Sequence, residues 1–251
     1  MSVKRSSQPQ RSGGWRFVTM AMGLILGLWV ALQWPVEFHE GVDFHVTTRT
    51  VPLYLKLARF ISRDLEYRHL VWTLTRDARN DEEKLLRLST WVRESLYAGV
   101  PTPLHVVDDH VWNIIVRRYG TSDQFADVLA TLCAYAGLPA ELVTFGPPGQ
   151  PRLYVLALVE VDGRWCPLDP FHGVIIRRPD GRLASREDIR ANPELARRAS
   201  PDILVGGRPY AAMYDGVPLH GPSGELRPYR QMPLWRCWYT VQRFFHHVVP
   251  E

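Results

Sequence analysis

The stretch "YGTSDQFADVLATLCAYAGLPAEL", Tyr119–Leu142, holds the clearest folding signal in the chain. Thr121, followed three residues later by Gln124, has the spacing of a capping box, in which two side chains satisfy free backbone amides at the start of a helix. Apolar residues then recur at helical spacing, and Gly137 supplies the conformation with which many helices end. The stretch therefore predicts a well-capped helix that begins at about Ser122.

Two amphipathic helices are predicted before this stretch. Residues 51–75 place apolar side chains three and four positions apart, as on one face of a helix. Residues 80–97, "NDEEKLLRLSTWVRESLY", begin with a capping residue and acidic side chains, which favour the positive end of a helix dipole. Both patterns indicate helices that pack one face on a core.

The periodicity changes after the Tyr119–Leu142 stretch. Residues 153–161 read as a β-strand, Asp162-Gly163 as a tight hairpin turn, and residues 164–168 as the returning strand. Residues 185–198 then read as one capped polar helix. Helices followed by an antiparallel sheet predict an α+β domain.

The order of these motifs resembles the transglutaminase-like group within the papain-like cysteine enzymes, over roughly residues 81–172. In that family the helix opens with Gly, any residue, Cys, two residues, an aromatic and Ala. "GTSDQFA" at 120–126 fits each fixed position except the cysteine, where Ser122 stands. The family's strand opens with His-Ala-Trp, and counting back from the hairpin turn places Tyr154 at the His. The resemblance thus implies a Cys-His-Asp triad of which only Asp169 is retained.

The chemistry of these replacements argues against the family's reaction. A thiol at a helix start gains thiolate character from the backbone dipoles and from a neighbouring imidazolium. A serine hydroxyl needs a base instead, and a tyrosine that titrates near 10 is a poor base at neutral pH. We therefore expect a catalytically inactive groove, lined in addition by Asp123, Gln124, Trp165 and His110, with no cofactor.

Two alternatives remain open at this point. His172 lies three residues beyond Asp169 and would complete a re-wired Ser122-His172-Asp169 centre in an active hydrolase or acyltransferase. A purely structural subunit of a membrane complex is the other alternative, and Tyr154 and Leu156 filling the groove would favour it. Against catalysis, Ser122 is also an ordinary residue for a helix start, and Asp169 before a proline is an ordinary turn residue.

A metal site is not predicted. No CxxC or CxxH spacing is present among the residues. His110 beside Asp108 and Asp109 is a possible cation site, but a single histidine in a polar loop is usually only hydrogen-bonded. Cys133 and Cys166 lie among apolar neighbours and are expected to be packed core thiols, whereas Cys237 is less constrained.

Residues 17–34, "FVTMAMGLILGLWVALQW", carry no charge. At a rise of about 1.5 Å per residue, a helix of this length just crosses a hydrocarbon layer of about 30 Å. Four basic residues and no acidic residue precede the segment, which orients the N-terminus toward the cytoplasm. We therefore expect a single-pass protein of the cell (inner) membrane, with its main domain in the periplasm or otherwise outside the cytoplasm.

Charge argues against nucleic acid as a partner. The formal net charge of +4 at pH 7 comes from 30 Lys and Arg against 26 Asp and Glu. The excess of four lies entirely before residue 34, so the remaining chain is formally neutral. The basic balance thus describes membrane orientation and not a nucleic-acid footprint.

These observations divide the chain into five parts. They are a basic cytoplasmic tail (1–16), a transmembrane helix (17–34), a membrane-proximal helical segment (35–80), a transglutaminase-like core (81–185) and a C-terminal extension packed on that core (186–251). The resemblance further implies that the groove binds a peptide, a glycan or a partner protein in cell-envelope or extracellular polysaccharide assembly.

Overall fold

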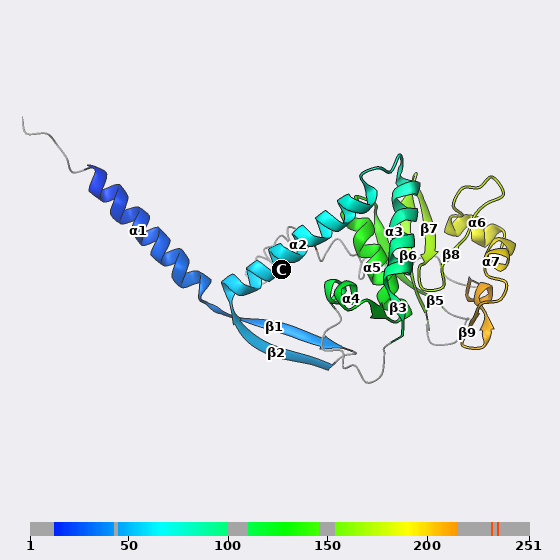
Figure 1. Cartoon of the computed structure of the whole chain (residues 1–251), viewed down its shortest axis with the longest axis horizontal. Helices are drawn as coiled ribbons and strands as arrows, with labels where there is room; N and C mark the ends of the chain where they lie inside the picture. Colours follow the sequence, from blue (N-terminus) through cyan, green and yellow to red (C-terminus); the bar gives the residue numbers. More distant parts are fainter. Residues whose placement is uncertain are drawn as a thin grey trace, which may run out of the picture.

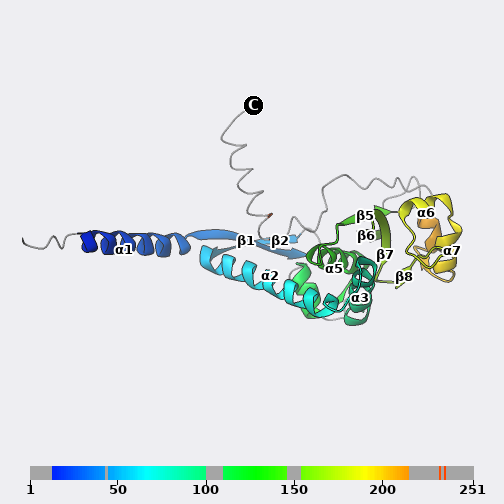
Figure 2. The ribbon, with the colours of Figure 1, turned by 90° about the horizontal axis from the view of Figure 1, so that it is seen from above.

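The computed structural model describes residues 13–42, 45–99, 110–145 and 154–214, together with 232 and 235. Figure 1 shows a long N-terminal arm that leads into a body of helices packed on a sheet. The arm consists of the helix α1 (Gly13–Leu32), the hairpin of β1 (Pro35–Val42) and β2 (His45–Pro52), and the first turns of α2 (Leu53–Thr75). The chain is therefore markedly elongated, as the view from above also shows (Figure 2).

Helix α1 covers most of the segment predicted to span a membrane. It points away from the body, and the large apolar side chains along it, from Trp15 to Val30, are mostly exposed to solvent. Among the residues that the structure describes, no helix is both long and apolar enough to cross a membrane.

The prediction of helix alone for residues 35–80 is wrong in its first part. Strands β1 and β2 pair antiparallel from Pro35 opposite Pro52 to Val42 opposite His45. Strand β2, "HVTTRTVP", holds two valines and three threonines, and such β-branched residues suit an extended, paired backbone. The helix follows directly, so only the remainder of this segment matches the prediction.

Helix α5 (Ser122–Tyr135) lies at the centre of the body. It contacts α2, α3 (Asp81–Ser95) and α4 (Val111–Arg117), and its other side packs on the sheet through β6 (Tyr154–Val161). Eight of its fourteen residues are buried, which explains why this sequence is apolar on more than one face.

The sheet has four antiparallel strands in the order β5-β6-β7-β8, where β5 is Ala140–Phe145, β7 is Arg164–Asp169 and β8 is Val174–Ile175. Asp162 and Gly163 both have positive φ (52° and 73°), so the β6–β7 hairpin has the predicted tight turn. Strand β5 is not among the predicted strands. The α+β class is confirmed.

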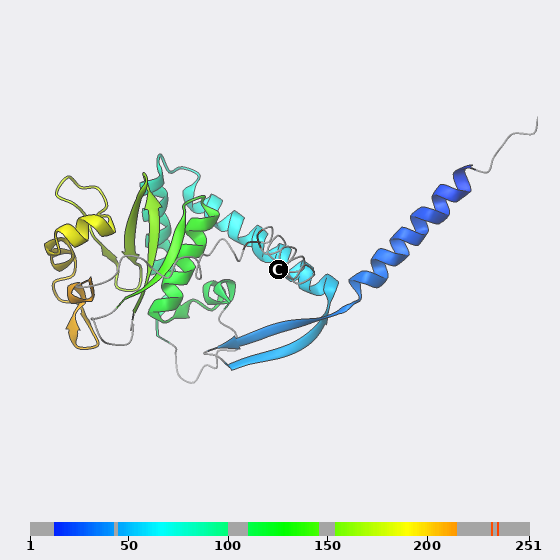
Figure 3. The same ribbon diagram turned by 180° about the vertical axis from the view of Figure 1, so that it is seen from behind.

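Figure 3 shows the C-terminal part beside the sheet from behind, and a second, smaller core of side chains lies where the two meet. Residues 185–198, predicted as one helix, form α6 (Arg186–Ala191) and α7 (Glu194–Ala199) instead. Pro193 separates them because it has no N–H for a continuing helix. The short strands β9 (Leu204–Val205) and β10 (Arg208–Pro209) and the 3₁₀ helix η1 (Tyr210–Tyr214) follow. The aromatic tail after them, with Cys237, lies outside the described residues except for positions 232 and 235.

Candidate functional site

The start of α5 is held by the predicted capping box. The Oε1 atom of Gln124 accepts a hydrogen bond from the backbone N–H of Thr121 at 3.1 Å and another from Arg117 Nη2 at 2.8 Å. A Cβ atom on Gly120 would lie 2.7 Å from the same oxygen, so only glycine leaves room for this arrangement. Gln124, expected to line a groove, therefore has a structural role in capping the helix.

A two-residue parallel pairing fixes where α5 begins. Strand β3 (Tyr97–Ala98) follows α3 and pairs with β4 (Tyr119–Gly120), which directly precedes α5. The backbone N–H of Tyr97 donates to Arg118 O, and that of Gly99 to Gly120 O, both at 2.8 Å. The end of α3 and the start of α5 are thereby tied together at one edge of the body.

The hairpin brings Tyr154 and Asp169 together. Tyr154 begins β6 and Asp169 ends β7, and the two strands run antiparallel from a single tight turn, so these residues share the end opposite that turn. The hydroxyl of Tyr154 donates to Asp169, with distances of 3.0 Å to Oδ2 and 3.2 Å to Oδ1. Both side chains are buried, with exposed fractions of 5% and 2%.

His172 joins this pair. Its Nδ1 atom lies 2.7 Å from the Tyr154 hydroxyl and 2.9 Å from Asp169 Oδ2. Because Tyr154 donates its single proton to the carboxylate, Nδ1 is left to carry a proton and donate it. Asp169 Oδ1 also accepts from the backbone N–H groups of Phe171 (3.0 Å) and His172 (3.1 Å). Asp169 is thus both a turn former and the centre of the cluster.

Ser122 is linked to the same cluster through Tyr154. A hydrogen bond from the Ser122 side chain lowers the pKa of Tyr154, but burial and the nearby charge of Asp169 raise it more. The net effect places the pKa of the phenol far above its usual value near 10. Tyr154 therefore stays protonated and acts as a hydrogen-bond donor at neutral pH.

Aromatic contacts hold the loop after β7 in place. His172 stacks on Tyr154 with ring centroids 5.4 Å apart, and Phe171 meets Phe125 of α5 edge to face at 5.2 Å. Tyr210 of η1 packs edge-on against Tyr154 at 6.2 Å and His172 at 5.6 Å and is fully buried. Burial raises the pKa of Tyr210, and the charge of Asp169 adds to the rise. Sequence reasoning missed Tyr210, which lies in a stretch without helical or strand periodicity.

The other predicted groove residues lie apart from this cluster, with one exception. Asp123 is exposed in the first turn of α5, next to Ser122. Trp165 pairs with Glu160 near the hairpin turn, four residues along β7 from Asp169, or about 13 Å at strand spacing. His110 caps α4 through a 3.2 Å bond from the N–H of Trp112 and lies at the other end of α5, beside Thr131.

Two other kinds of side chain bear on the chemistry of this part of the chain, namely possible metal ligands and the cysteine thiols. Among the described residues, no group of three or more His, Cys, Asp or Glu side chains is placed to hold a metal ion, and Asp108 and Asp109 lie outside them. Cys133 and Cys166 are free and buried, as expected. Burial raises the pKa of the Cys133 thiol and raises that of Cys166 to about 11, so both are poor nucleophiles at neutral pH.

The comparisons with known proteins agree with the fold and with the order of motifs. Residues 68–170 match the family model of the transglutaminase-like superfamily. The match covers less than half of the chain and includes α5 and the β6–β7 hairpin, so this part of the chain is similar to a transglutaminase-like domain.

Solved structures resemble the chain more distantly. One is "a Putative Cysteine Protease from Cytophaga hutchinsonii", 17% identical, with a TM-score of 0.38 over 50% of this chain and 44% of that one. Another, described as a TGase, is 12% identical, with a TM-score of 0.38 over 74% of this chain and 54% of that one. The chain thus spans about half the length of these structures, and TM-scores of this size do not extend the assignment. No curated protein matches the chain.

Proposed function

We propose that this protein is a membrane-anchored, catalytically inactive member of the transglutaminase-like superfamily, whose groove at the start of α5 binds a peptide, a glycan or a partner protein in the cell envelope. The observation that carries the proposal is the buried Tyr154, which stands at the position of the family's histidine and donates its proton to Asp169. A phenol whose pKa is raised stays protonated near neutral pH and is therefore a poor base for the Ser122 proton.

The hydrogen bonds around Asp169 support this interpretation. In a Cys-His-Asp or Ser-His-Asp centre the carboxylate orients a base, and the base accepts the proton of the nucleophile. Here the carboxylate is occupied by Tyr154, His172 and two backbone N–H groups. Since the pKa of Tyr154 is raised, its deprotonated form, which would be needed to activate Ser122, is negligible near pH 7.

A membrane location is part of the proposal and rests on α1. The exposed apolar side chains of this helix surround it on all sides, and water is a poor environment for such a surface. A lipid layer would cover it, with the basic residues at the N-terminus on the cytoplasmic side. The transglutaminase-like domain would then face the envelope, where a peptide, a glycan or an assembly partner is available.

The central test is an activity assay with the full chain in detergent. We expect no transfer from a glutamine-containing peptide to hydroxylamine and no peptide hydrolysis, and Ser122→Ala should equal the wild type. The double variant Ser122→Cys/Tyr154→His restores the family's residue types and serves as the gain-of-function arm. Turnover by the wild type that disappears in Ser122→Ala would overturn the proposal of inactivity.

One observation favours a second candidate, the re-wired Ser122-His172-Asp169 centre. His172 Nδ1 faces Asp169 at 2.9 Å, which leaves Nε2 free to act as a base, as in a catalytic histidine. A fluorophosphonate probe distinguishes the two candidates because it labels only an activated serine. Covalent labelling at Ser122 that is lost in His172→Gln would establish this second candidate, and we expect no labelling.

The burial of Tyr154 and Leu156 also bears on the structural-subunit alternative, since both side chains pack into the second core. Affinity capture of the full chain separates it from groove binding. We expect Asp123→Lys, a charge reversal at the exposed first turn of α5, to lose partners that Arg190→Glu, on α6, retains. Identical partners for the wild type and both variants would favour a structural role outside the groove.

A further inference from the structure

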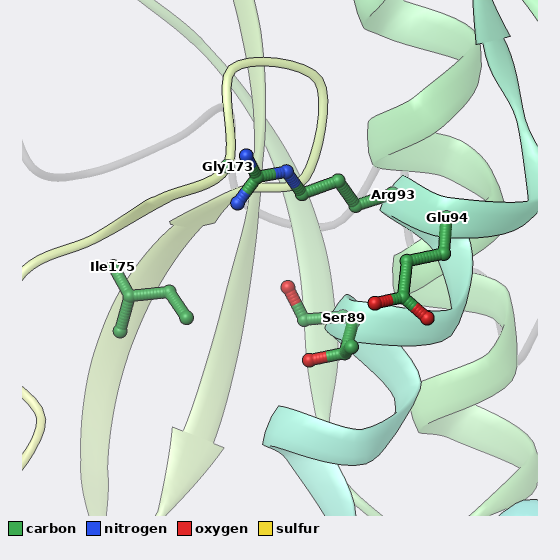
Figure 4. A pocket seen from close by; sticks show the side chains of 6 residues that line it. Ser89, Arg93, Glu94, Gly173 and Ile175 are labelled. Atoms are coloured by element: carbon green, nitrogen blue, oxygen red, sulfur yellow. The ribbon is translucent and has the colours of Figure 1, made fainter.

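A cavity lies between α3 and the turn that follows His172. Its volume is about 400 Å³, within the range of roughly 300–1,000 Å³ that is typical of small-molecule sites. The last two turns of α3 form one wall and the start of β8 forms the other (Figure 4). The lining residues combine opposite charges, hydroxyl groups and one apolar side chain, and they are Ser89, Thr90, Arg93, Glu94, Gly173 and Ile175.

Arg93 is positioned by the backbone of Gly173. Figure 4 shows its side chain reaching from α3 to this glycine. Gly173 has φ of 70°, which favours glycine, and a Cβ atom there would displace the Arg93 guanidinium from its present place. Among the described residues Arg93 has no carboxylate within ion-pair distance, whereas Arg87 on the same helix binds Glu83 at 2.7 Å. The charge of Arg93 is therefore available to a ligand.

Glu94 supplies the opposite charge. Its carboxylate turns away from Arg93 and toward the part of the helix that carries Ser89, as Figure 4 shows. Glu94 also forms no ion pair within the described part of the chain. Ser89 is almost fully buried, with 5% exposure, and Ile175 lies on the strand side of the cavity, opposite Ser89 and Glu94 (Figure 4). The cavity thus combines a cation and an anion that both come from α3 with one apolar side chain from β8.

We propose that this cavity binds a free amino acid in its zwitterionic form. The guanidinium fork of Arg93 matches a carboxylate, for which arginine offers two parallel donors. Glu94 accepts hydrogen bonds from the ammonium group, and its negative charge disfavours phosphate or sulfate beside Arg93. The apolar side chain of the ligand contacts Ile175. This pattern requires both charges of the ligand, which neither a simple carboxylate nor a simple amine supplies.

The cavity lies next to the His172 cluster, so a bound ligand would affect that cluster. Gly173 directly follows His172, whose ring is stacked on Tyr154. A ligand held by Arg93 would fix the turn that contains Gly173. It would thereby change the environment of the neighbouring His172 ring. The inference does not depend on whether Ser122 is reactive, because the cavity is lined by α3 and β8 and not by α5.

Calorimetric titration of the full chain in detergent tests the proposal. The probes are glycine, alanine and leucine, with 4-methylpentanoate and 3-methylbutylamine as analogues of leucine that each keep a single charge. We expect saturable binding of leucine and at least about tenfold weaker binding of either analogue, which corresponds to the loss of one charge-assisted contact. Glucuronate and inorganic phosphate serve as anions without an ammonium group.

Variants locate the binding in the cavity. Arg93→Gln and Glu94→Gln should each weaken leucine binding by about tenfold or more, whereas Arg87→Gln should leave it within about twofold. All three positions lie on the surface side of α3, and circular dichroism checks that each variant folds. No saturation by any of the three amino acids up to about 10 mM, equal binding by Arg93→Gln, or tighter binding of phosphate or glucuronate overturns the proposal.

Discussion

At the scale of single residues, Tyr154 organises the candidate site. Its hydroxyl connects Ser122 with Asp169 and His172. A buried carboxylate is stable only when hydrogen-bond donors surround it, and Tyr154 is one of several such donors to Asp169. The residue is therefore a structural requirement of this site.

Removal of that hydroxyl should be measurable. Tyr154→Phe keeps the ring but leaves Asp169 with one donor fewer, and we expect the free energy of unfolding to fall by about 1–3 kcal/mol. Urea denaturation measures the change. Tyr97→Phe is the matched control, since the Tyr97 side chain is exposed and should alter stability by less than about 0.5 kcal/mol. Equal effects of the two changes would contradict the central place of Tyr154.

Asp127 on α5 makes stability depend on pH. Burial, and secondarily the charge of Asp123, raise its pKa to about 6, and its Oδ1 atom has no hydrogen-bond partner among the described residues. Because the folded pKa exceeds the unfolded value of about 3.9, the folded state holds the proton more tightly. The free energy of unfolding should therefore fall as the pH rises from about 4 to about 6. Above pH 6 it should stay at the lower value, because Asp127 is then ionised in both the folded and the unfolded state.

Asp127→Asn removes this titration. We expect the variant to be more stable than the wild type near pH 7.5, by at most about 3 kcal/mol, and the difference to disappear near pH 4. Thermal unfolding at a series of pH values in a constant buffer mixture provides the measurement. Asp180→Asn, at a carboxylate exposed to solvent, is the control. Parallel pH profiles for the wild type and Asp127→Asn would show that the carboxyl is not buried as described.

At the scale of elements, the start of α5 depends on Gly120 and Gln124 together. Gly120→Ala places a Cβ atom against Gln124 Oε1, and Gln124→Ala removes that oxygen. Each single change should destabilise the protein by about 1–2 kcal/mol through loss of the capping box. The double variant should cost much less than the sum, because the alanine at 120 no longer meets an obstacle. Additive losses in a double-mutant cycle would refute this coupling.

The β6–β7 hairpin is the other element on which the site depends. Its turn fixes the register, so Leu168 lies opposite Ala157, and the strand ends that carry Tyr154 and Asp169 meet. A slip of one residue would turn each side chain to the other face of the sheet. The turn residues therefore fix which side chains meet at the opposite end of the hairpin, where the site lies.

At the scale of the whole molecule, the arm and the body differ in how much apolar side-chain surface they expose to solvent. The arm exposes large apolar side chains on α1, whereas the body buries two apolar cores. Deletion of residues 1–34 should move the protein from the membrane pellet to the supernatant after cell fractionation, because that surface is removed. The melting temperature of the body should change little, since α1 extends away from it (Figure 1). A deletion variant that still sediments with membranes would contradict anchoring through α1.

Local signals in the sequence determined the main helices and the β6–β7 hairpin. The cap at Thr121, the Asp162-Gly163 turn and the apolar faces of α2 and α3 each involve residues a few positions apart, and their hydrogen bonds and periodicity can be read without the fold. The order of these motifs also gave the resemblance to the transglutaminase-like superfamily, which the family model matches over residues 68–170.

Only the tertiary structure decided which side chains meet. Tyr210 reaches Tyr154 across 56 positions, and Arg93 reaches Gly173 across 80, and no periodic pattern connects such pairs. The same applies to His110 and Trp165, which the fold places away from Ser122. These contacts depend on how helices pack on the sheet, and packing is determined by the shapes of all the side chains together. The sequence therefore specified the helix start and the hairpin, and the packing decided that a buried tyrosine connects them.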